Sequence, residues 1–168
     1  NIKEVVVSDG VTSIGEYAFY SFGKVTKITI PDSVTEIGKR AFSTCKVLAS
    51  ITLPEGITTI REGTFASCTG LTSFTIPASV TTIKEICGEG GTLCLRMESA
   101  TPPVLAKATN LAKDDVLIVP EGAAEAYKKH PVWGKFKNIS EDPRLNADSV
   151  SSPSSDKVSS KQKEKTEP

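Results

Sequence analysis

Two consecutive stretches of the chain have nearly the same sequence. "ITIPDSVTEIGKRAFSTCKVLAS" runs from Ile28 to Ser50, and "ITLPEGITTIREGTFASCTGLTS" follows it directly, from Ile51 to Ser73. A weaker copy, "VVVSDGVTSIGEYAFYSFGKVTK", lies before them from Val5 to Lys27, and "FTIPASVTTIKE" begins another at Phe74. A fixed period in the low twenties, with apolar residues in register, is typical of a solenoid, whose units bury their apolar faces by stacking on one another.

The start of each unit predicts a strand. Ile28 and Ile30 flank Thr29, and the same alternation of apolar and hydroxyl residues returns in the next two units. This is the period of a strand with one buried face. Proline follows each of these strands, and it ends them because it lacks an N–H donor and fixes φ. The three prolines are Pro31, Pro54 and Pro77.

The second half of each unit has a different spacing. Its apolar positions are Ile37, Ala41, Phe42, Cys45 and Leu48 in one unit, and Ile60, Thr64, Phe65, Cys68 and Leu71 occupy the matching places in the next. Offsets of four, five, eight and eleven residues from the first position favour one or two helical turns. We therefore expect a β-rich α/β solenoid of strand, turn, short helix and return.

Two residue types that repeat at fixed positions are expected to lie in the core. Cys45 and Cys68 recur at one position of the repeat, so they should face inward as small apolar groups. A zinc site is not expected, because it needs four clustered ligands and the chain has a single His. Phe42 and Phe65 should stack on each other and hold the units in register.

The repeats resemble a known family. Leu48-x-x-Ile51-x-Leu53 and Leu71-x-x-Phe74-x-Ile76 look like the L-x-x-L-x-L core of leucine-rich repeats. The repeat consensus IPxxVTxIGxxAFxxCxxLxx is similar to that of the BspA-type subclass. In this subclass proline and a following Val or Ile stand where the general pattern has a buried Asn or Cys. The resemblance extends from Val5 to about Ile83 and implies a leucine-rich-repeat solenoid.

The region after the repeats is expected to close the array. Leu93, Leu95 and Met97 alternate like a terminal strand, and "DDVLIVPEGAAEAYKKHPVWGKFKNI" resembles the closing segment found after BspA-like arrays. Within it we expect a last strand at Val116 to Val119 and a short helix at Ala123 to Lys129. Trp133 and Phe136 should cover the bottom of the core.

Three regions follow from these patterns. Residues 1–95 are expected to form the leucine-rich repeat array, and residues 96–139 a small mixed C-terminal cap. Residues 140–168 contain no aromatic residue and few apolar ones, so they cannot bury enough surface to offset their ordering entropy. They are expected to be a disordered tail or linker.

Composition and motifs exclude several function classes. Lys+Arg and Asp+Glu both number 20, so no global field favours nucleic acid, and no apolar run approaches the ~20 residues of a membrane helix. His130 is expected at the surface, and "GEGG" at Gly88 to Gly91 lacks the GK[ST] ending of a phosphate loop. Because no paired carboxylates, triad or cofactor loop stands at a useful position, we expect no enzyme, cofactor or metal site.

Two features remain open on the sequence alone. Cys87 and Cys94 lie on either side of "GEGGTL" and either form a disulfide or remain two buried thiols. The chain begins at Asn1, without an initiator Met or a signal peptide, and is expected to be the C-terminal part of a longer protein.

The outward side chains of the expected strands carry the functional hypothesis. They form two parallel rows, Thr29, Thr52 and Thr75 in one and Lys27, Ser50 and Ser73 in the other. This hydroxyl-rich stripe either reflects the general suitability of Thr for exposed strands or is a partner-binding surface.

The family resemblance implies a function for that stripe. BspA-like proteins are surface or secreted bacterial proteins that adhere to proteins of a host or a neighbouring cell, such as those of the extracellular matrix. We therefore expect an extracellular, monomeric protein-binding module. The alternative is a structural spacer that presents another domain and has no ligand of its own.

Overall fold

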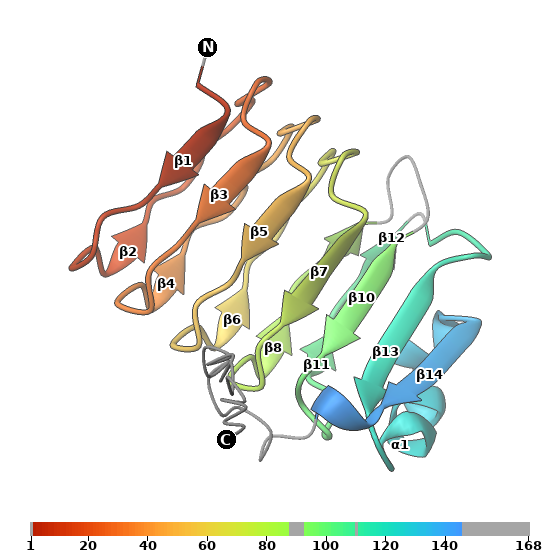
Figure 1. Cartoon of the computed structure of the whole chain (residues 1–168). Helices are drawn as coiled ribbons and strands as arrows, with labels where there is room; N and C mark the ends of the chain where they lie inside the picture. Colours follow the sequence, from red (N-terminus) through yellow and green to blue (C-terminus); the bar gives the residue numbers. More distant parts are fainter. Residues whose placement is uncertain (1, 88–92, 110, 146–168) are drawn as a thin grey trace, which may run out of the picture.

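The chain winds into a solenoid with two layers of parallel strands. The computed structural model describes residues 2–87, 93–109 and 111–145. Each turn from β1 to β12 places one longer strand in one layer and one or two short strands in the other, whereas α1 and η1 follow β13 (Figure 1). The longer strands are β1 (Glu4–Val6), β3 (Lys27–Thr29), β5 (Ser50–Thr52), β7 (Ser73–Ile76), β10 (Cys94–Met97), β13 (Val116–Pro120) and β14 (Asn138–Asp142).

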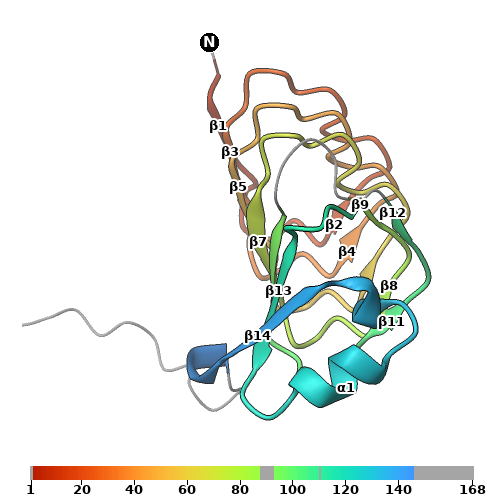
Figure 2. The same ribbon diagram turned by 90° about the vertical axis from the view of Figure 1, so that its right-hand side faces the viewer.

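The second layer lies across the core from the first (Figure 2). Its strands are β2 (Ser13–Ile14), β4 (Glu36–Ile37), β6 (Thr59–Ile60), β8 (Thr82–Ile83), β9 (Ile86–Cys87), β11 (Val104–Leu105) and β12 (Ala108–Thr109). The helical elements, all near the C-terminal end, are α1 (Ala124–Lys129), η1 (Trp133–Lys135) and η2 (Pro143–Leu145). The fold is thus a β-rich leucine-rich-repeat solenoid with little helix, as the sequence predicts.

The sequence repeat becomes the register of the strands. Ile28 lies opposite Ile51 in the β3–β5 pair, and Ile37 lies opposite Ile14 in the β2–β4 pair. Because side chains of a strand alternate between its two faces, this register stacks inward apolar side chains of paired strands on one another. The buried core is consequently one continuous apolar column between the two layers.

The segment predicted to be a short helix is instead a run of tight turns. Within it, Arg40 and Thr44 have positive φ values of 54° and 65°, which a right-handed helix does not allow. The N–H groups of Arg40, Phe42 and Thr44 donate to carbonyl oxygens of Glu62, Thr64 and Ala66 in the next unit, at 3.2, 3.1 and 2.8 Å. Alternate N–H groups therefore bond between units here, whereas those of Ala41, Ser43 and Cys45 bond to the residue three positions earlier. In an α-helix every N–H would bond within one unit to the residue four positions earlier.

An aromatic stack fills the core beside these turns. The rings of Phe42 and Phe65 are parallel, with centroids 5.8 Å apart, and Phe19 stacks on Phe42 at 5.5 Å. This confirms the predicted stacking, although Phe65 is only partly buried whereas Phe42 is fully buried. The fourth unit has no Phe at this position, and the stack ends on Phe74 of β7, whose ring centroid lies 5.1 Å from that of Phe65.

The repeated cysteines face the core, as predicted. Cys45 and Cys68 are buried free thiols, and each donates an S–H hydrogen bond to a carbonyl oxygen of the preceding unit, on Phe19 and Phe42, both at 3.0 Å. Burial raises the pKa of the Cys45 thiol. Cys94 is also a free cysteine, so it forms no disulfide with Cys87. The side chain of Cys87 and the "GEGG" stretch lie outside the described residues.

The closing segment continues the first layer. β13 pairs with β10 and β14 pairs with β13, all in parallel. The predicted strands at 93–97 and 116–119, the short helix and the buried Trp133 and Phe136 are confirmed. Trp133 donates its indole N–H to the carbonyl oxygen of Pro103 at 2.8 Å, which satisfies its polar edge inside the core.

Two details of the closing segment were predicted wrongly. β13 is not the last strand, because β14 follows it, and residues 140–145, which the sequence assigned to the tail, complete β14 and form η2. The apolar signal in β14 is weak, since Ile139 alone among its five residues is apolar. Residues 146–168 lie outside the described part, and the proposed division into array and cap at residue 95 stays a prediction.

The aromatic stack generates a stability prediction. Phe42→Ala should lower the free energy of unfolding by about 3 to 5 kcal/mol, because it leaves a cavity in the fully buried core. Phe65→Ala should cost less, since that ring is partly exposed. Thr52→Ala, on an exposed strand position, should cost less than about 0.5 kcal/mol. Equilibrium urea unfolding of the three variants measures the differences, and equal losses for Phe42→Ala and Thr52→Ala would contradict the assignment of the two faces.

Candidate functional site

The outer surface of the longer strands, here the long-strand face, contains the six residues predicted to bind a partner. Parallel pairing places Lys27 beside Ser50 and Thr29 beside Thr52. All six side chains lie on the outer side of their strands, four of them exposed and Thr29 and Thr75 half-buried. The structure thus confirms where these residues lie, and it shows that each row runs along the face from unit to unit.

The rows extend beyond the residues that sequence reasoning found. Ser73 and Thr75 pair with Cys94 and Arg96 of β10, which in turn pair with Val116 and Ile118 of β13. The repeat interval shortens here, from 23 residues between Ser50 and Ser73 to 21 between Ser73 and Cys94. The alternation of Leu93, Leu95 and Met97 was the available signal for the continuation.

Strand pairing is interrupted in the middle of the face, between β5 and β7. The longer strands pair as β1-β3-β5 and as β7-β10-β13-β14, although Figure 1 shows β5 and β7 side by side. The N–H groups of Ser50 and Cys94 donate to the preceding unit at 3.2 and 2.7 Å. The N–H of Ser73 makes no such bond within the described residues, and that of Thr72 turns back to the Gly70 carbonyl oxygen at 3.1 Å.

The interruption, which we call the seam, has a cause in the core. Phe74 occupies the inward position of β7 that isoleucine holds in β3 and β5, at Ile28 and Ile51. A phenyl ring is larger than an isoleucine side chain, and this ring also packs against Phe65. We attribute the separation of β5 from β7 to the space that this ring takes.

A groove follows the seam. It has a volume of about 290 Å³ and is lined by Ile51, Thr52, Leu53, Glu55, Ser73, Phe74, Thr75, Pro77 and Glu98. Three of the six predicted residues, Thr52, Ser73 and Thr75, lie in this lining. The sequence did not predict the groove, because the outward hydroxyl residues repeat regularly across it. The residue that differs is the inward Phe74, which stands where β3 and β5 have isoleucine.

Two carboxylates, Glu55 and Glu98, lie among the residues that line the groove. Burial raises the pKa of Glu98, and the neighbouring charge of Glu55 raises it further, against the opposing effect of a hydrogen bond from the Ala78 backbone N–H. Like charges raise each other's pKa when both ionise in one place. The groove thus combines hydroxyl groups in its wall with a concentration of negative charge.

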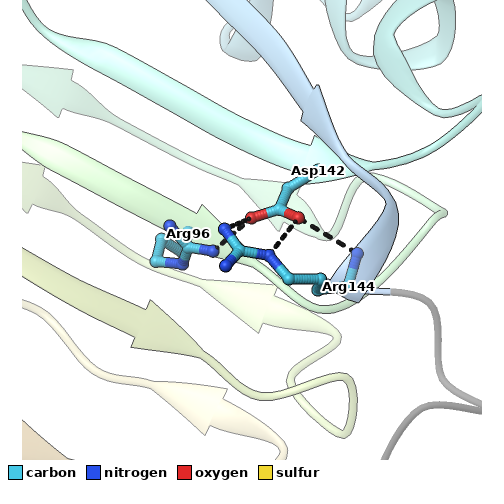
Figure 3. A network of polar contacts seen from close by, with 3 residues as sticks. All are labelled: Arg96, Asp142 and Arg144. Carbon is cyan, nitrogen blue, oxygen red and sulfur yellow. Dashed lines mark hydrogen bonds and ion pairs between the residues drawn. The ribbon is translucent and has the colours of Figure 1, made fainter.

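The two cations of the face's outward rows are held by carboxylates of the same chain. Lys27 pairs with Glu4 of the neighbouring strand at 2.8 Å. Arg96 pairs with Asp142 at the end of β14 at 2.6 Å, and Arg144 contacts the same carboxylate at 2.8 Å (Figure 3). Arg96, Asp142 and Arg144 form what we call the clasp, which joins two strands that are separated by β13.

A second concavity lies on the other side of the molecule, along the second layer. It has a volume of about 480 Å³ and is lined by Lys39, Thr59, Arg61, Glu62, Lys84, Glu85, Ala106 and Lys107. Its charges pair across units, with Lys39 to Glu62 at 3.0 Å and Lys107 to Glu85 at 3.3 Å. These pairs link neighbouring units, and Arg61 of the same lining pairs with Glu36.

His130 is half-buried and has a structural role that the sequence did not predict. Its Nδ1 accepts hydrogen bonds from the N–H groups of Val132 and Trp133 at 3.2 and 3.3 Å, so it organises the start of η1. Among residues 2–87, 93–109 and 111–145, no group of three or more His, Cys, Asp or Glu could hold a metal ion. No helix in that part is long and apolar enough to cross a bilayer.

Comparisons with known proteins agree with this architecture. The family model of the BspA type leucine rich repeat region (6 copies) matches residues 1–95. A leucine rich cell surface protein from Faecalibacterium prausnitzii A2-165 is similar in structure, with a TM-score of 0.53 and 24% identity. The similarity covers 83% of this chain and 32% of that protein, so the chain spans about a third of its length.

A leucine rich repeat protein of T. pallidum is also similar, with a TM-score of 0.43 and 20% identity over 76% of this chain and 83% of that one. A search of the curated proteins finds no match. At 24% identity, the similarity to the Faecalibacterium prausnitzii protein shows the fold alone.

The clasp generates a prediction about pH. The side chain and backbone N–H of Arg144, and then Arg96, hold the pKa of Asp142 well below its ordinary value. A carboxyl whose pKa is lowered by folding stabilises the fold above its unfolded pKa of about 3.9, and that contribution is lost as pH falls through the lower folded pKa. Asp142→Asn should therefore lower the urea midpoint at pH 7, and the difference from the unsubstituted chain should shrink only below about pH 4.

The matched control for the clasp is Glu125→Gln, which removes the exposed Glu125–Lys128 pair of α1. Exposed pairs of this kind contribute little to stability, so its midpoint should stay close to that of the unsubstituted chain. Equal midpoints for Asp142→Asn and Glu125→Gln at pH 7 would show that the clasp does not hold β14 in place.

Proposed function

The chain belongs to the BspA-type leucine-rich repeat family, and we propose that it is a protein-binding module of a bacterial surface or secreted protein. In this proposal the long-strand face binds proteins of a host or a neighbouring cell, including those of the extracellular matrix. The observation that supports it best is the groove at the seam, because it opens within the outward hydroxyl rows of a regular, parallel face.

The chemistry of the face suits protein contacts. Ser50, Thr52, Ser73 and Thr75 can each donate and accept hydrogen bonds, and Glu55 and Glu98 add two carboxylates to the groove within this central patch. At the seam, the Ser73 N–H is free of backbone partners within the described residues. A partner side chain in the groove would find both hydroxyl and backbone hydrogen-bonding groups there.

The size of the face limits the affinity. Seven strands spaced about 4.8 Å apart, with three to five residues each, give a strip of roughly 400 Å². A standard specific interface buries about 800 Å² per partner. Binding through this face alone should therefore be weak and transient, unless neighbouring loops take part in the contact.

Location at the cell surface is part of the same proposal. The similar protein of Faecalibacterium prausnitzii is described as a cell surface protein, and the family resemblance points the same way. We propose that the module acts as a monomer without cofactor or catalysis. The competing function is that of a spacer which presents another domain and binds nothing itself.

Substitutions on the two layers distinguish binding from spacing. Thr29, Thr52 and Thr75 changed to Lys should abolish capture of purified extracellular-matrix proteins immobilised as a panel, because three long charged side chains would cover the face and the groove. The matched control changes Thr35, Thr58 and Thr81 to Lys, which are exposed threonines one unit apart at the entry to the second layer. This control should bind like the unsubstituted chain.

Two other results would count against the proposal. If the unsubstituted chain captures none of the panel, the spacer function is favoured. If both triple variants lose capture equally while their thermal unfolding is unchanged, binding does not depend on the long-strand face.

A further inference from the structure

A row of carboxylates runs along the edge of the long-strand face where the strands end. Its members are Asp9, Asp32, Glu55, Glu98 and Glu121, which we call the acidic row. The first three follow one another at intervals of 23 residues, each three positions after its strand, while Glu98 and Glu121 directly follow β10 and β13. Because all these strands are parallel, their carboxyl ends lie at the same edge, and the row follows that edge. It skips β7, which is followed by Pro77 and Ala78.

The acidic row has no ion pair to a cation of this chain within the described residues, a property it shares with Glu16, Asp114, Asp115 and Glu141. Within the described residues, the ion pairs use Glu4, Glu36, Glu62, Glu85, Glu125 and Asp142. None of them involves a member of the acidic row. Four members are exposed and Glu98 is half-buried.

The surrounding cations do not neutralise this edge. Lys27 is held by Glu4 and Arg96 by Asp142. Arg144, the cation at the far end of the edge, is part of the clasp. Lys24 and Lys46 are exposed in the turns that precede β3 and β5, so they lie at the opposite edge of the face. The face therefore has a negative edge where its strands end and positive residues where they begin.

The groove meets the acidic row at its centre. Glu55 and Glu98 belong to both, and they are close enough for their charges to interact. A volume of about 290 Å³ is at the lower limit of small-molecule pockets, which suits one inserted side chain better than a cofactor. The side chain that complements two carboxylates and hydroxyl groups is a lysine or an arginine.

We propose that the partner of the long-strand face is a protein segment rich in lysine or arginine, which lies along the acidic row and inserts one basic side chain into the groove at Glu55 and Glu98. This inference rests on the proposed function and specifies the chemistry of its partner. Complementary charge of this kind mainly raises the association rate and fixes the orientation of a partner. Binding should accordingly weaken as salt screens the row.

The test uses a fluorescein-labelled peptide of ten lysines and the full chain. Fluorescence anisotropy at low salt should show binding that weakens as salt is added, and a peptide of ten glutamates should not bind. The variant with Asp32→Asn, Glu55→Gln and Glu98→Gln should bind the lysine peptide about tenfold more weakly. The matched control, with Glu36→Gln, Glu62→Gln and Glu85→Gln, removes the same charge from the second layer and should change affinity less than twofold.

The outcomes separate this inference from the proposed function. Equal weakening by the two triple variants would mean that the peptide senses net charge only, and it would overturn the inference, as would unchanged binding by both. Thermal unfolding checks that each variant is folded. If a matrix protein is captured through the face but the acidic-row variant captures it fully at every salt concentration, the proposed function stands and the basic partner is wrong.

Discussion

The parallel stack of Phe19, Phe42 and Phe65 is the constraint on which the rest of the molecule depends. It fixes the distance between three successive units at the turns, where alternate backbone N–H groups donate to carbonyl oxygens of the next unit. Three other features repeat with the same spacing between units as these rings. They are the backbone hydrogen bonds between the turns, the register of the paired strands, and the S–H hydrogen bonds of Cys45 and Cys68. The outward rows of the long-strand face are regular for the same reason.

The place where the stack ends is also the place where the face becomes irregular. The fourth unit has no ring at the turn position, and Phe74 of β7 packs against the last ring of the stack from the strand side, tilted by 48°. We attribute both the separation of β5 from β7 and the groove on the outer surface to this inward phenylalanine. The candidate site thus results from how the core is terminated, and it does not depend on any unusual residue on the face itself.

Much of the fold could be predicted because a repeat makes each local pattern recur. The 23-residue period predicted that the units stack on one another. The alternation around Thr29 predicted which face of the strand is buried, and the proline after it predicted where the strand ends. The short helix was wrong because apolar spacing does not report the sign of φ at Arg40 or Thr44, nor the pairing of N–H groups with a neighbouring unit. β14 was missed because its residues are mostly polar and are held in place by the Asp142 clasp.

The central claim, that the sheet is open at the seam and available to a partner there, can be measured by amide hydrogen exchange resolved by residue. Ser50 and Cys94, whose N–H groups bond to the preceding unit, should exchange slowly. Ser73 should exchange much faster in the free chain and become protected when a partner binds. If Ser73 were as protected as Ser50 and Cys94 in the free chain, the sheet would be continuous, and the groove would lose its structural basis.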